Sequence, residues 1–310
     1  MNDITAFLIA TIASGTPLLF ATLGEILTEK VGNLNLGVEG MMLLGASFSF
    51  VAGMASANPI FALLAGMAAG GAGALIYAFL TVSLRANQVV TGLSLTIFGS
   101  GVADFIGKSL TGTTLSTAVT AVYMPLRIPV LGDIPILGAF FSQSILVYFG
   151  YAIAVLMWLY LYNTSGGLRA RAVGENPASA DASGISVNAN KYAHICVGGM
   201  LSGIAGAYLS IYYSPTWQPG ITGGMGWIAV ALVIFAVWNP MRAIIGAYVF
   251  GGLKIIGFQF QKLGVNIPTQ FVDMLPYFVT IIVLIFISIR KSRKNPPPGN
   301  LGNAYFREER

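Results

Sequence analysis

Residues 36–85 read LGVEGMMLLGASFSFVAGMASANPIFALLAGMAAGGAGALIYAFLTVSLR, and no charged side chain follows Glu39 until the last residue, Arg85. An Asn-Pro dipeptide divides the stretch into two apolar runs, 36–54 and 59–83. A helix rises 1.5 Å per residue, so about 20 apolar residues cross the hydrocarbon core of a bilayer. Each run therefore predicts a transmembrane helix.

The whole chain has the composition of a membrane protein. Of its 310 residues, 55% are hydrophobic and 9% are charged, whereas about 25% of the residues of soluble domains are charged. The single cysteine, Cys196, and the single histidine, His194, exclude an intramolecular disulfide and a Cys/His site for zinc, haem or an iron–sulfur cluster. The sequence also contains no GxxxxGK(S/T) phosphate-binding loop, so ATP would have to be bound by another chain.

Further apolar runs lie between charges and turn signals along the chain. With the first two, they give nine candidate spans, at 4–23, 36–54, 59–83, 89–107, 138–161, 192–213, 226–238, 242–260 and 272–289. The count ranges from eight to ten because the run at 226–238 is short and Asn239-Pro240 separates it from the next. We predict an all-α polytopic bundle, with a transmembrane domain at 1–290 and a basic tail at 291–310.

The positions of lysine and arginine predict the orientation, because cytoplasmic loops are enriched in both. Six basic residues lie from Arg290 onward, and three lie in the loop at 162–191. Both segments are therefore expected in the cytoplasm, with four spans between them. Counting back along the chain places Arg85 inside, the loop at 108–137 outside and the N-terminus outside.

Many of the glycines occur at helical spacing within the apolar runs. Gly66 and Gly70 form one GxxxG pair, and Gly199 and Gly203 form another. Small residues at this spacing allow two helix backbones to approach closely in a membrane. Tight packing within one bundle is the favoured interpretation, and a dedicated dimerisation face is the alternative.

Residues 166–185, GGLRARAVGENPASADASGI, contain signals for a short helix between two spans. Asn176 is a preferred N-cap residue, Pro177 suits the first helical position, and Gly184 favours the left-handed conformation after the end. These signals predict a two-turn helix at 177–183. Its small side chains would allow it to enter a groove of another protein; the alternative is a capped loop helix that binds nothing.

The run AVGENP at 172–177, followed by AD at 180–181 and GI at 184–185, resembles the coupling segment of ABC importer permeases of the ribose, branched-chain amino acid and nucleoside group. The resemblance implies that the segment docks on a separate ATPase subunit, which binds ATP and Mg, and that this chain binds no cofactor. The residues expected at the ATPase contact are Arg169, Arg171, Gly174, Glu175, Asn176, Pro177, Ala178, Ala180, Asp181 and Gly184.

Further blocks narrow the resemblance to nucleoside transporters. GEILTEKVGNLNLGVEGMM at 24–42 and ANQVVTGL at 86–93 are similar to the shorter permease of systems linked to basic-membrane-protein type lipoproteins. GWIAVALVIF at 226–235 matches another block of this group. The resemblance implies transport of a small polar solute, a nucleoside, by alternating access; a ribose-type sugar is the alternative.

The same resemblance implies the partners and the location. We expect a second, homologous permease that forms a heterodimer with this chain, a substrate-binding lipoprotein, and the cytoplasmic (inner) membrane of a bacterium. The net charge of +5 is concentrated in the tail after residue 289. It therefore indicates membrane topology and not a nucleic-acid partner.

Several polar residues near or within the spans are candidates for the substrate pathway. They are Asn35, Glu39, Asn87, Gln88 and Thr91. A carboxylate within a span costs about 3 kcal/mol, so Glu39 should face the interior or a partner, with an interface position or a cap on a neighbouring helix as alternatives. Gln88 and Thr91 share a helix face and could line a cavity or bond between helices. The block before Glu39 predicts an irregular or re-entrant entry to the second span.

Two other classes of protein compete with a permease. An intramembrane serine protease would need Ser202 and His194 within hydrogen-bond reach, but eight residues along one helix separate them by about 12 Å. We therefore expect no enzyme activity in this chain. An ion-coupled secondary transporter is the remaining alternative.

Overall fold

The computed structural model describes residues 3–262, 268–290 and 297–307, and these are mostly helical. The helices are α1 (Asp3–Lys30), α2 (Val38–Ser56), α3 (Pro59–Ala78), α4 (Gln88–Gly107), α5 (Thr117–Thr120), α6 (Ile145–Asn163), α7 (Ser165–Glu175), α8 (Pro177–Ala182), α9 (Val187–Tyr208), α10 (Met225–Phe235), α11 (Pro240–Lys262) and α12 (Thr269–Arg290). Short π-helices, Phe79–Ser83 and Leu209–Tyr213, continue α3 and α9. Strands β1 (Leu126–Arg127) and β2 (Ser142–Gln143) form one small antiparallel pair.

Each apolar run expected from the sequence lies mainly in a helix, although the run at 138–161 begins in the β1–β2 region and α6 starts only at Ile145. Within the part of the chain that the structure describes, six helices are long and apolar enough to cross a membrane: Asp3–Lys30, Val38–Ser56, Pro59–Ser83, Gln88–Leu110, Ile145–Asn163 and Val187–Tyr213. The helix α10 is shorter than a span, at 11 residues. The helical transmembrane architecture is thereby confirmed, whereas the count of nine spans stays a prediction.

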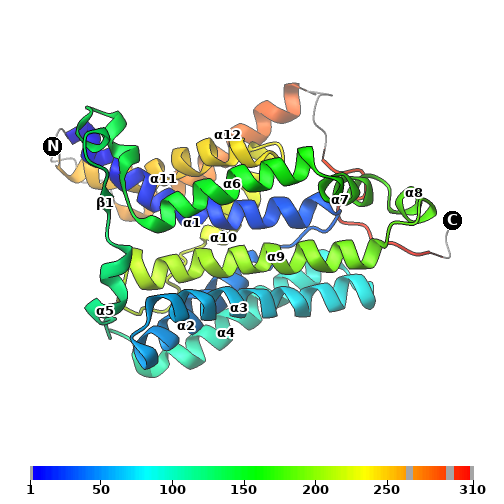
Figure 1. Cartoon of the computed structure of the whole chain (residues 1–310), viewed down its shortest axis with the longest axis horizontal. Coiled ribbons are helices and arrows are strands. Elements are labelled where there is room, and N and C mark those ends of the chain that lie inside the picture. The colour runs from blue at the N-terminus through cyan, green and yellow to red at the C-terminus, as the bar shows by residue number, and fades with distance from the viewer. Residues whose placement is uncertain (1–2, 263–267, 291–296, 308–310) are drawn as a thin grey trace.

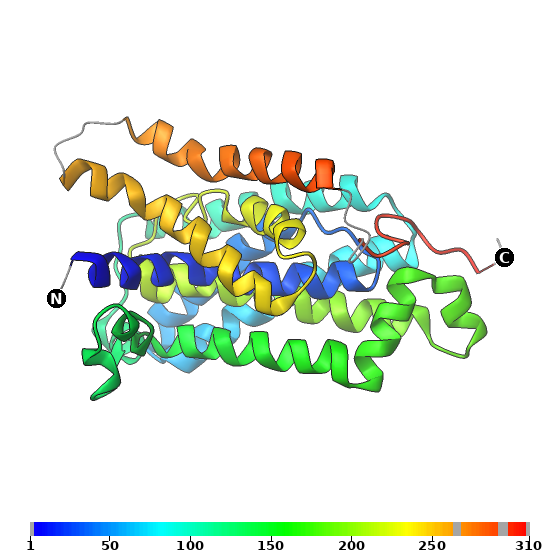
Figure 2. The same ribbon diagram turned by 90° about the horizontal axis from the view of Figure 1, so that it is seen from above.

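The long helices run along one axis, and the chain begins and ends at opposite ends of the bundle (Figure 1). One end carries α7, α8 and residues 297–307, and we call it the α8 end. The opposite end carries α5 and the β1–β2 pair, and we call it the β1 end. Figure 2 gives the view turned by 90°, in which α12 lies along one side of the bundle. Four basic residues of the expected tail lie outside the described residues: Lys291, Arg293, Lys294 and Arg310.

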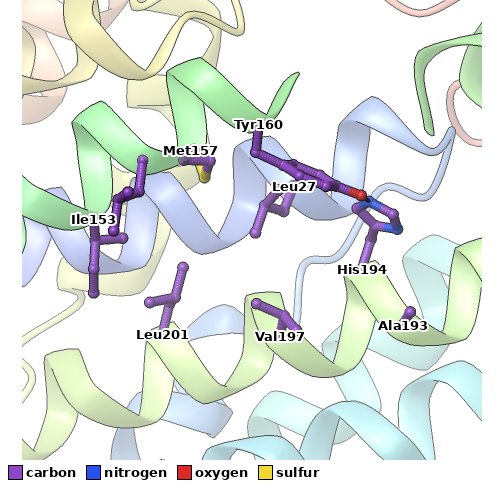
Figure 3. A pocket seen from close by; sticks show the side chains of 9 residues that line it. Leu27, Ile153, Met157, Tyr160, Ala193, His194, Val197 and Leu201 are labelled. Carbon is purple, nitrogen blue, oxygen red and sulfur yellow. Dashed lines mark hydrogen bonds between the residues drawn. The ribbon is translucent and has the colours of Figure 1, made fainter. Parts of the chain in front are cut away.

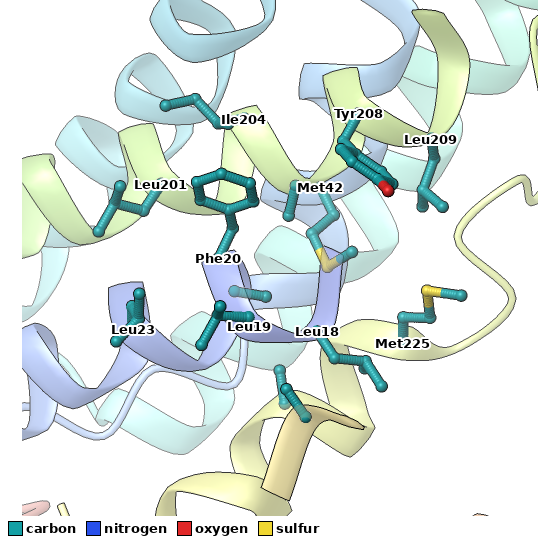
Figure 4. Packing of buried hydrophobic residues seen from close by; sticks show 14 of the residues in the cluster. Leu18, Leu19, Phe20, Leu23, Met42, Leu201, Ile204, Tyr208, Leu209 and Met225 are labelled. Carbon is teal, nitrogen blue, oxygen red and sulfur yellow. The ribbon is translucent and has the colours of Figure 1, made fainter. Parts of the chain in front are cut away.

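The core lies where α1, α2 and α9 meet (Figure 4). Leu18 and Phe20 of α1 and Met42 of α2 are fully buried there. Tyr208 of α9 is also buried, and its hydroxyl donates to the Ala13 carbonyl at 2.9 Å. The polar end of this large side chain is thus satisfied inside the bundle.

The two GxxxG pairs face each other across the α3–α9 interface. A Cβ atom on Gly70 would overlap the backbone of Gly199 and Gly203, and one on Gly203 would overlap the Gly66 carbonyl. Backbone therefore packs directly on backbone here, which only residues without side chains allow. The interpretation as internal packing is confirmed.

Candidate functional site

Helix α7 begins immediately after α6 and ends against α1. The Thr164 side chain accepts a hydrogen bond from the Gly167 amide at 3.1 Å and so begins the helix. At its other end, a Cβ atom on Gly174 would overlap the Lys30 carbonyl, the last residue of α1. Gly174 thus allows the end of α7 to rest on the end of α1. The end of α7 is therefore in direct backbone contact with the end of α1.

Helix α8 forms where the sequence predicts it, one residue shorter at the C-terminal end. The Asn176 side chain caps it by accepting from the Ser179 amide at 3.0 Å, and Pro177 occupies the first turn. Gly184 follows the helix with a φ of 77°, in the left-handed region. A helix this short has little stability of its own, so the caps and the contacts beneath it hold its shape.

The expected docking residues are not all at the surface. Those exposed are Arg169, Glu175, Asn176 and Gly184, and those half-buried are Arg171, Ala178 and Asp181. Those buried inside the chain are Gly174, Pro177 and Ala180. The buried residues therefore support the segment from within and do not form its outer surface. Ser179, absent from the expected set, is exposed on α8.

A small apolar core, separate from that of the bundle, lies beneath α8. Its buried residues are Val31, Ala170, Val173, Ala180 and Val187. They come from the turn after α1, from α7 and α8, and from the start of α9. The α8 end is therefore packed as a unit of its own, joined to the bundle at the ends of α1 and α9.

Two non-helical segments enter the bundle from opposite ends. Glu39, in the first turn of α2 directly after one of them, bonds to the end of the other. Residues 31–37 enter from the α8 end, and residues 214–224 enter from the β1 end, where Thr216 pairs with Thr114. The Glu39 carboxylate accepts hydrogen bonds from the Thr222 hydroxyl at 2.6 Å, the Gly224 amide at 3.0 Å and the Gly226 amide at 2.6 Å. Glu39 therefore caps the N-terminus of α10, the alternative that the sequence left open. The irregular entry to the second span is also present, where residues 31–37 are non-helical.

The other pathway candidates lie around the segment 31–37. Asn35 is buried, and its side-chain oxygen accepts from the Gly37 amide at 2.9 Å. Gln88 is buried at the start of α4, and its side-chain oxygen accepts from the Leu34 amide at 2.7 Å. Asn87 is exposed and caps α4, while Thr91 is buried one turn further on. The structure thus brings Asn35 and Gln88 together as supports of one irregular turn.

Two buried carboxylates beside this turn were not among the residues singled out from the sequence. Glu25 accepts from the Asn35 amide at 2.9 Å, and Glu29 accepts from the Trp238 indole nitrogen at 2.5 Å. Both carboxylates are nearly inaccessible to solvent. Their spacing of four residues on one helix face was the available signal, since it places both on the same side of α1. They fix the segments before α2 and after α10 to α1.

A cavity of about 440 Å³ opens between α1, α6 and α9 (Figure 3). Its lining is apolar except at one end, where Tyr160 and His194 point toward each other. The His194 Nδ1–H donates to the Asn190 carbonyl at 2.7 Å, so its Nε2 accepts from the Tyr160 hydroxyl at 2.9 Å. With these groups paired, the cavity offers apolar surface and suits a polar solute poorly.

Among residues 3–262, 268–290 and 297–307, no group of three or more His, Cys, Asp and Glu side chains could hold a metal ion. The polar groups at the α8 end and around Glu39 instead bind backbone amides and one another. Their arrangement serves to position segments of chain.

Comparison with known proteins agrees with this architecture. The family described as "Branched-chain amino acid transport system / permease component" matches residues 7–284. A Haloferax volcanii protein, provisionally named a glucose ABC transporter permease, is 38% identical, with 99% of each chain covered. The guanosine ABC transporter permease NupQ of Bacillus subtilis is 34% identical, with 89% of each chain covered.

A nucleoside ABC transporter permease of Lactococcus lactis is 35% identical, with 87% of this chain and 88% of that protein covered. These proteins are permease subunits, which transport a solute and catalyse no reaction. The resemblance drawn from the blocks at 172–177, 24–42 and 86–93 is confirmed. Since the match extends over nearly the whole transmembrane region, the chain belongs to the branched-chain amino acid transport system permease family.

Proposed function

We propose that this chain is one permease subunit of an ATP-driven importer for nucleosides. The observation that carries the proposal is the capped helix α8, which lies at one end of the bundle with Asn176 and Ser179 exposed. A separate ATPase subunit, which binds ATP and Mg, would dock there. Its movement would reach α1 through the contact of Gly174 with Lys30 and would open the pathway alternately to each side.

The α8 end is the cytoplasmic end in this proposal. Lys30 and Arg85 lie there, together with the basic residues of α7, as the enrichment of cytoplasmic loops in lysine and arginine requires. The chain starts and finishes at opposite ends of the bundle, which an odd number of crossings satisfies (Figure 1). We accordingly retain nine spans, an outer N-terminus and a location in the cytoplasmic membrane of a bacterium.

A second, homologous permease and a substrate-binding lipoprotein complete the proposed transporter. Two guanosine ABC transporter permeases of Bacillus subtilis, NupQ and NupP, match this chain at 34% and 25% identity. A pair of unequal permeases in one organism supports a heterodimer. The solute would pass between the two subunits, because the described cavity within this chain is apolar.

The pathway candidates divide into two groups in this proposal. Asn87 is exposed at the start of α4; its side-chain oxygen caps the helix, so its side-chain nitrogen would face the solute, whereas Thr91 is buried and would support the wall. Asn35, Glu39 and Gln88 use their polar atoms on nearby backbone and would shape the wall without contacting the solute. Amides and hydroxyls both donate and accept hydrogen bonds, which suits the ribose and base of a nucleoside.

A simple sugar is the second candidate solute. It is favoured by the Haloferax volcanii relative, which is 38% identical and provisionally named a glucose permease. The two solute classes share hydroxyl groups, so the polar residues near α4 do not separate them. Measurements of transport distinguish the two solute classes.

The complete transporter, reconstituted in proteoliposomes, tests the solute and the energy source together. We expect ATP-dependent uptake of radiolabelled guanosine and no uptake of glucose or ribose above background. Uptake of glucose or ribose instead of guanosine would establish the second candidate. Uptake without ATP that an ionophore abolishes would overturn the ATP-driven importer in favour of ion coupling.

The docking role of α8 is tested by enlarging an exposed side chain on it. Ser179→Trp adds bulk at an exposed position of α8, and Ser179 is not part of the small core beneath this helix. We expect it to abolish uptake and the binding of the ATPase at normal expression. Ser179→Ala is the matched control and should leave both unchanged. ATPase binding by Ser179→Trp at the wild-type level would exclude this surface as the docking site.

A further inference from the structure

Residues 297–307, which we call the C-terminal strap, pack back onto the α8 end (Figure 2, red). The Asn300 amide donates to the Gly174 carbonyl at 2.9 Å, and the Gly302 amide donates to the Gly32 carbonyl at 3.3 Å. The Gly299 amide donates to the Glu175 carboxylate at 3.1 Å. The strap thus bonds to the end of α7 and to the turn after α1 at the same time.

The strap also reaches α8 itself. The Tyr305 hydroxyl donates to the Asp181 carboxylate at 2.9 Å, and Arg307 pairs with the same oxygen at 3.1 Å. The Tyr305 ring packs against the small apolar core beneath α8. Arg307 is 73% exposed, so Tyr305 is the better-defined of the two contacts.

A third set of contacts joins the strap to the start of α4. The Gln88 side-chain nitrogen donates to the Asn303 carbonyl at 3.3 Å, and the Gln88 side-chain oxygen accepts from the Leu34 amide. The Arg85 guanidinium lies over the Phe306 ring, 4.8 Å from its centroid. One short segment therefore touches α8, the irregular turn 31–37 and α4.

We propose that the C-terminal strap is a second mechanical link between the docking helix and the pathway, and that Tyr305 is a positioning residue that holds Asp181 of α8. The first link runs from Gly174 to α1; the second runs from α8 through the strap to Gln88. Because Gln88 also supports the turn before α2, the strap ties ATPase movement to the segments nearest the proposed pathway. This inference rests on the proposed function.

The test measures ATP hydrolysis and guanosine uptake in the same proteoliposomes of the complete transporter. Tyr305→Phe keeps the ring in the small core and removes only the hydroxyl. A hydrogen bond to a charged acceptor shifts an equilibrium by about tenfold, so guanosine moved per ATP hydrolysed should fall about threefold to tenfold while hydrolysis continues. Asn303→Ala is the control: the described contacts of Asn303 use its backbone, which the substitution keeps, so the ratio should not change.

A second measurement reports on α8 without transport. Hydrogen exchange at the backbone amides of 178–182 should be faster in Tyr305→Phe than in the wild type, because α8 loses a contact that holds it in place. A chain ending at residue 296 should show a larger effect of the same kind.

The outcomes separate this inference from the proposed function. A wild-type transporter without ATP-dependent uptake overturns both. An active wild type with the same transport ratio and the same hydrogen exchange in Tyr305→Phe overturns the strap alone. Proportional loss of hydrolysis and uptake in Tyr305→Phe also overturns it, because that result indicates weaker ATPase docking and not a lost link.

Discussion

The α3–α9 interface and the α8 end are held together in different ways. At the interface, Gly66, Gly70 and Gly203 bring two backbones into direct contact, with no side chain between them. At the α8 end, a small core and side-chain hydrogen bonds, such as that from Tyr305 to Asp181, hold short segments on the bundle. Close backbone contact leaves the first region little room for one helix to slide along the other, whereas side chains that rotate would let the second region adjust.

This difference suits a protein that transmits motion. A bundle whose helices slid past one another would absorb a displacement applied at α8. Backbone contact at α3–α9 opposes such sliding, so in the proposed mechanism displacement at the α8 end would be passed on through the ends of α1 and α4. The tight α3–α9 interface would therefore allow an adjustment at the α8 end to act on the rest of the bundle.

The largest effect on stability is expected at the α3–α9 interface, where the two helix backbones are in direct contact. Gly203→Ala places a methyl group against the Gly66 carbonyl, and neither helix has a side chain that can yield. We expect a loss of about 3 kcal/mol in the free energy of unfolding, with low recovery of folded protein. Gly101→Ala on α4 is the matched control, because nothing lies within 4 Å of its added Cβ. It should be neutral or stabilise by up to about 1 kcal/mol through helix propensity.

Thermal unfolding in detergent, followed by fluorescence, measures both variants. Equal stability of Gly203→Ala and Gly101→Ala would mean that α3 and α9 can separate without cost. The contrast between a rigid interface and an adjustable end would then be lost.

A smaller effect on stability is expected at Glu39, whose side chain bonds α2 to the start of α10 inside the bundle. Glu39→Ala leaves the Thr222 hydroxyl and two backbone amides without their acceptor in a buried place. We expect a loss of about 2 kcal/mol in the free energy of unfolding, and a smaller loss for Glu39→Gln, which keeps one oxygen. Parallel unfolding and uptake measurements decide between a cap and a pathway residue. Wild-type stability with abolished uptake would assign Glu39 to the pathway.

Local patterns predicted the helices and the shape of α8 well. The apolar run at 59–83 became Pro59–Ser83, and Asn176 and Gly184 adopt the capping roles that their side chains favour. Such features depend on neighbours in the sequence, which the pattern contains. The GxxxG pairs likewise indicated close helix packing, although not which helices would meet.

Contacts between distant residues could not be predicted in this way. Glu39 bonds Thr222 across 183 positions, and Tyr305 bonds Asp181 across 124. The periodicity of a sequence carries no information about which distant residues meet. From the sequence, the C-terminal strap was therefore expected only as part of a basic tail. For the same reason Gly174 was expected on the docking surface, whereas the end of α1 covers it.

The smallest effect is expected at the cap of α8. Asn176→Ala removes the acceptor for the Ser179 amide and should weaken α8 by about 1 kcal/mol. Because α8 lies outside the rigid bundle, the unfolding temperature of the whole protein should stay unchanged while ATP-dependent uptake falls severalfold. Ser186→Ala is the matched control: Ser186 precedes α9 as its cap residue, but its side chain makes no capping bond, so both quantities should match the wild type. Faster hydrogen exchange at the backbone amides of 178–182 would show that the change is confined to α8. If Asn176→Ala instead lowered the unfolding temperature as Glu39→Ala does, α8 would be part of the rigid bundle, and its motion could not be transmitted separately from that of α1.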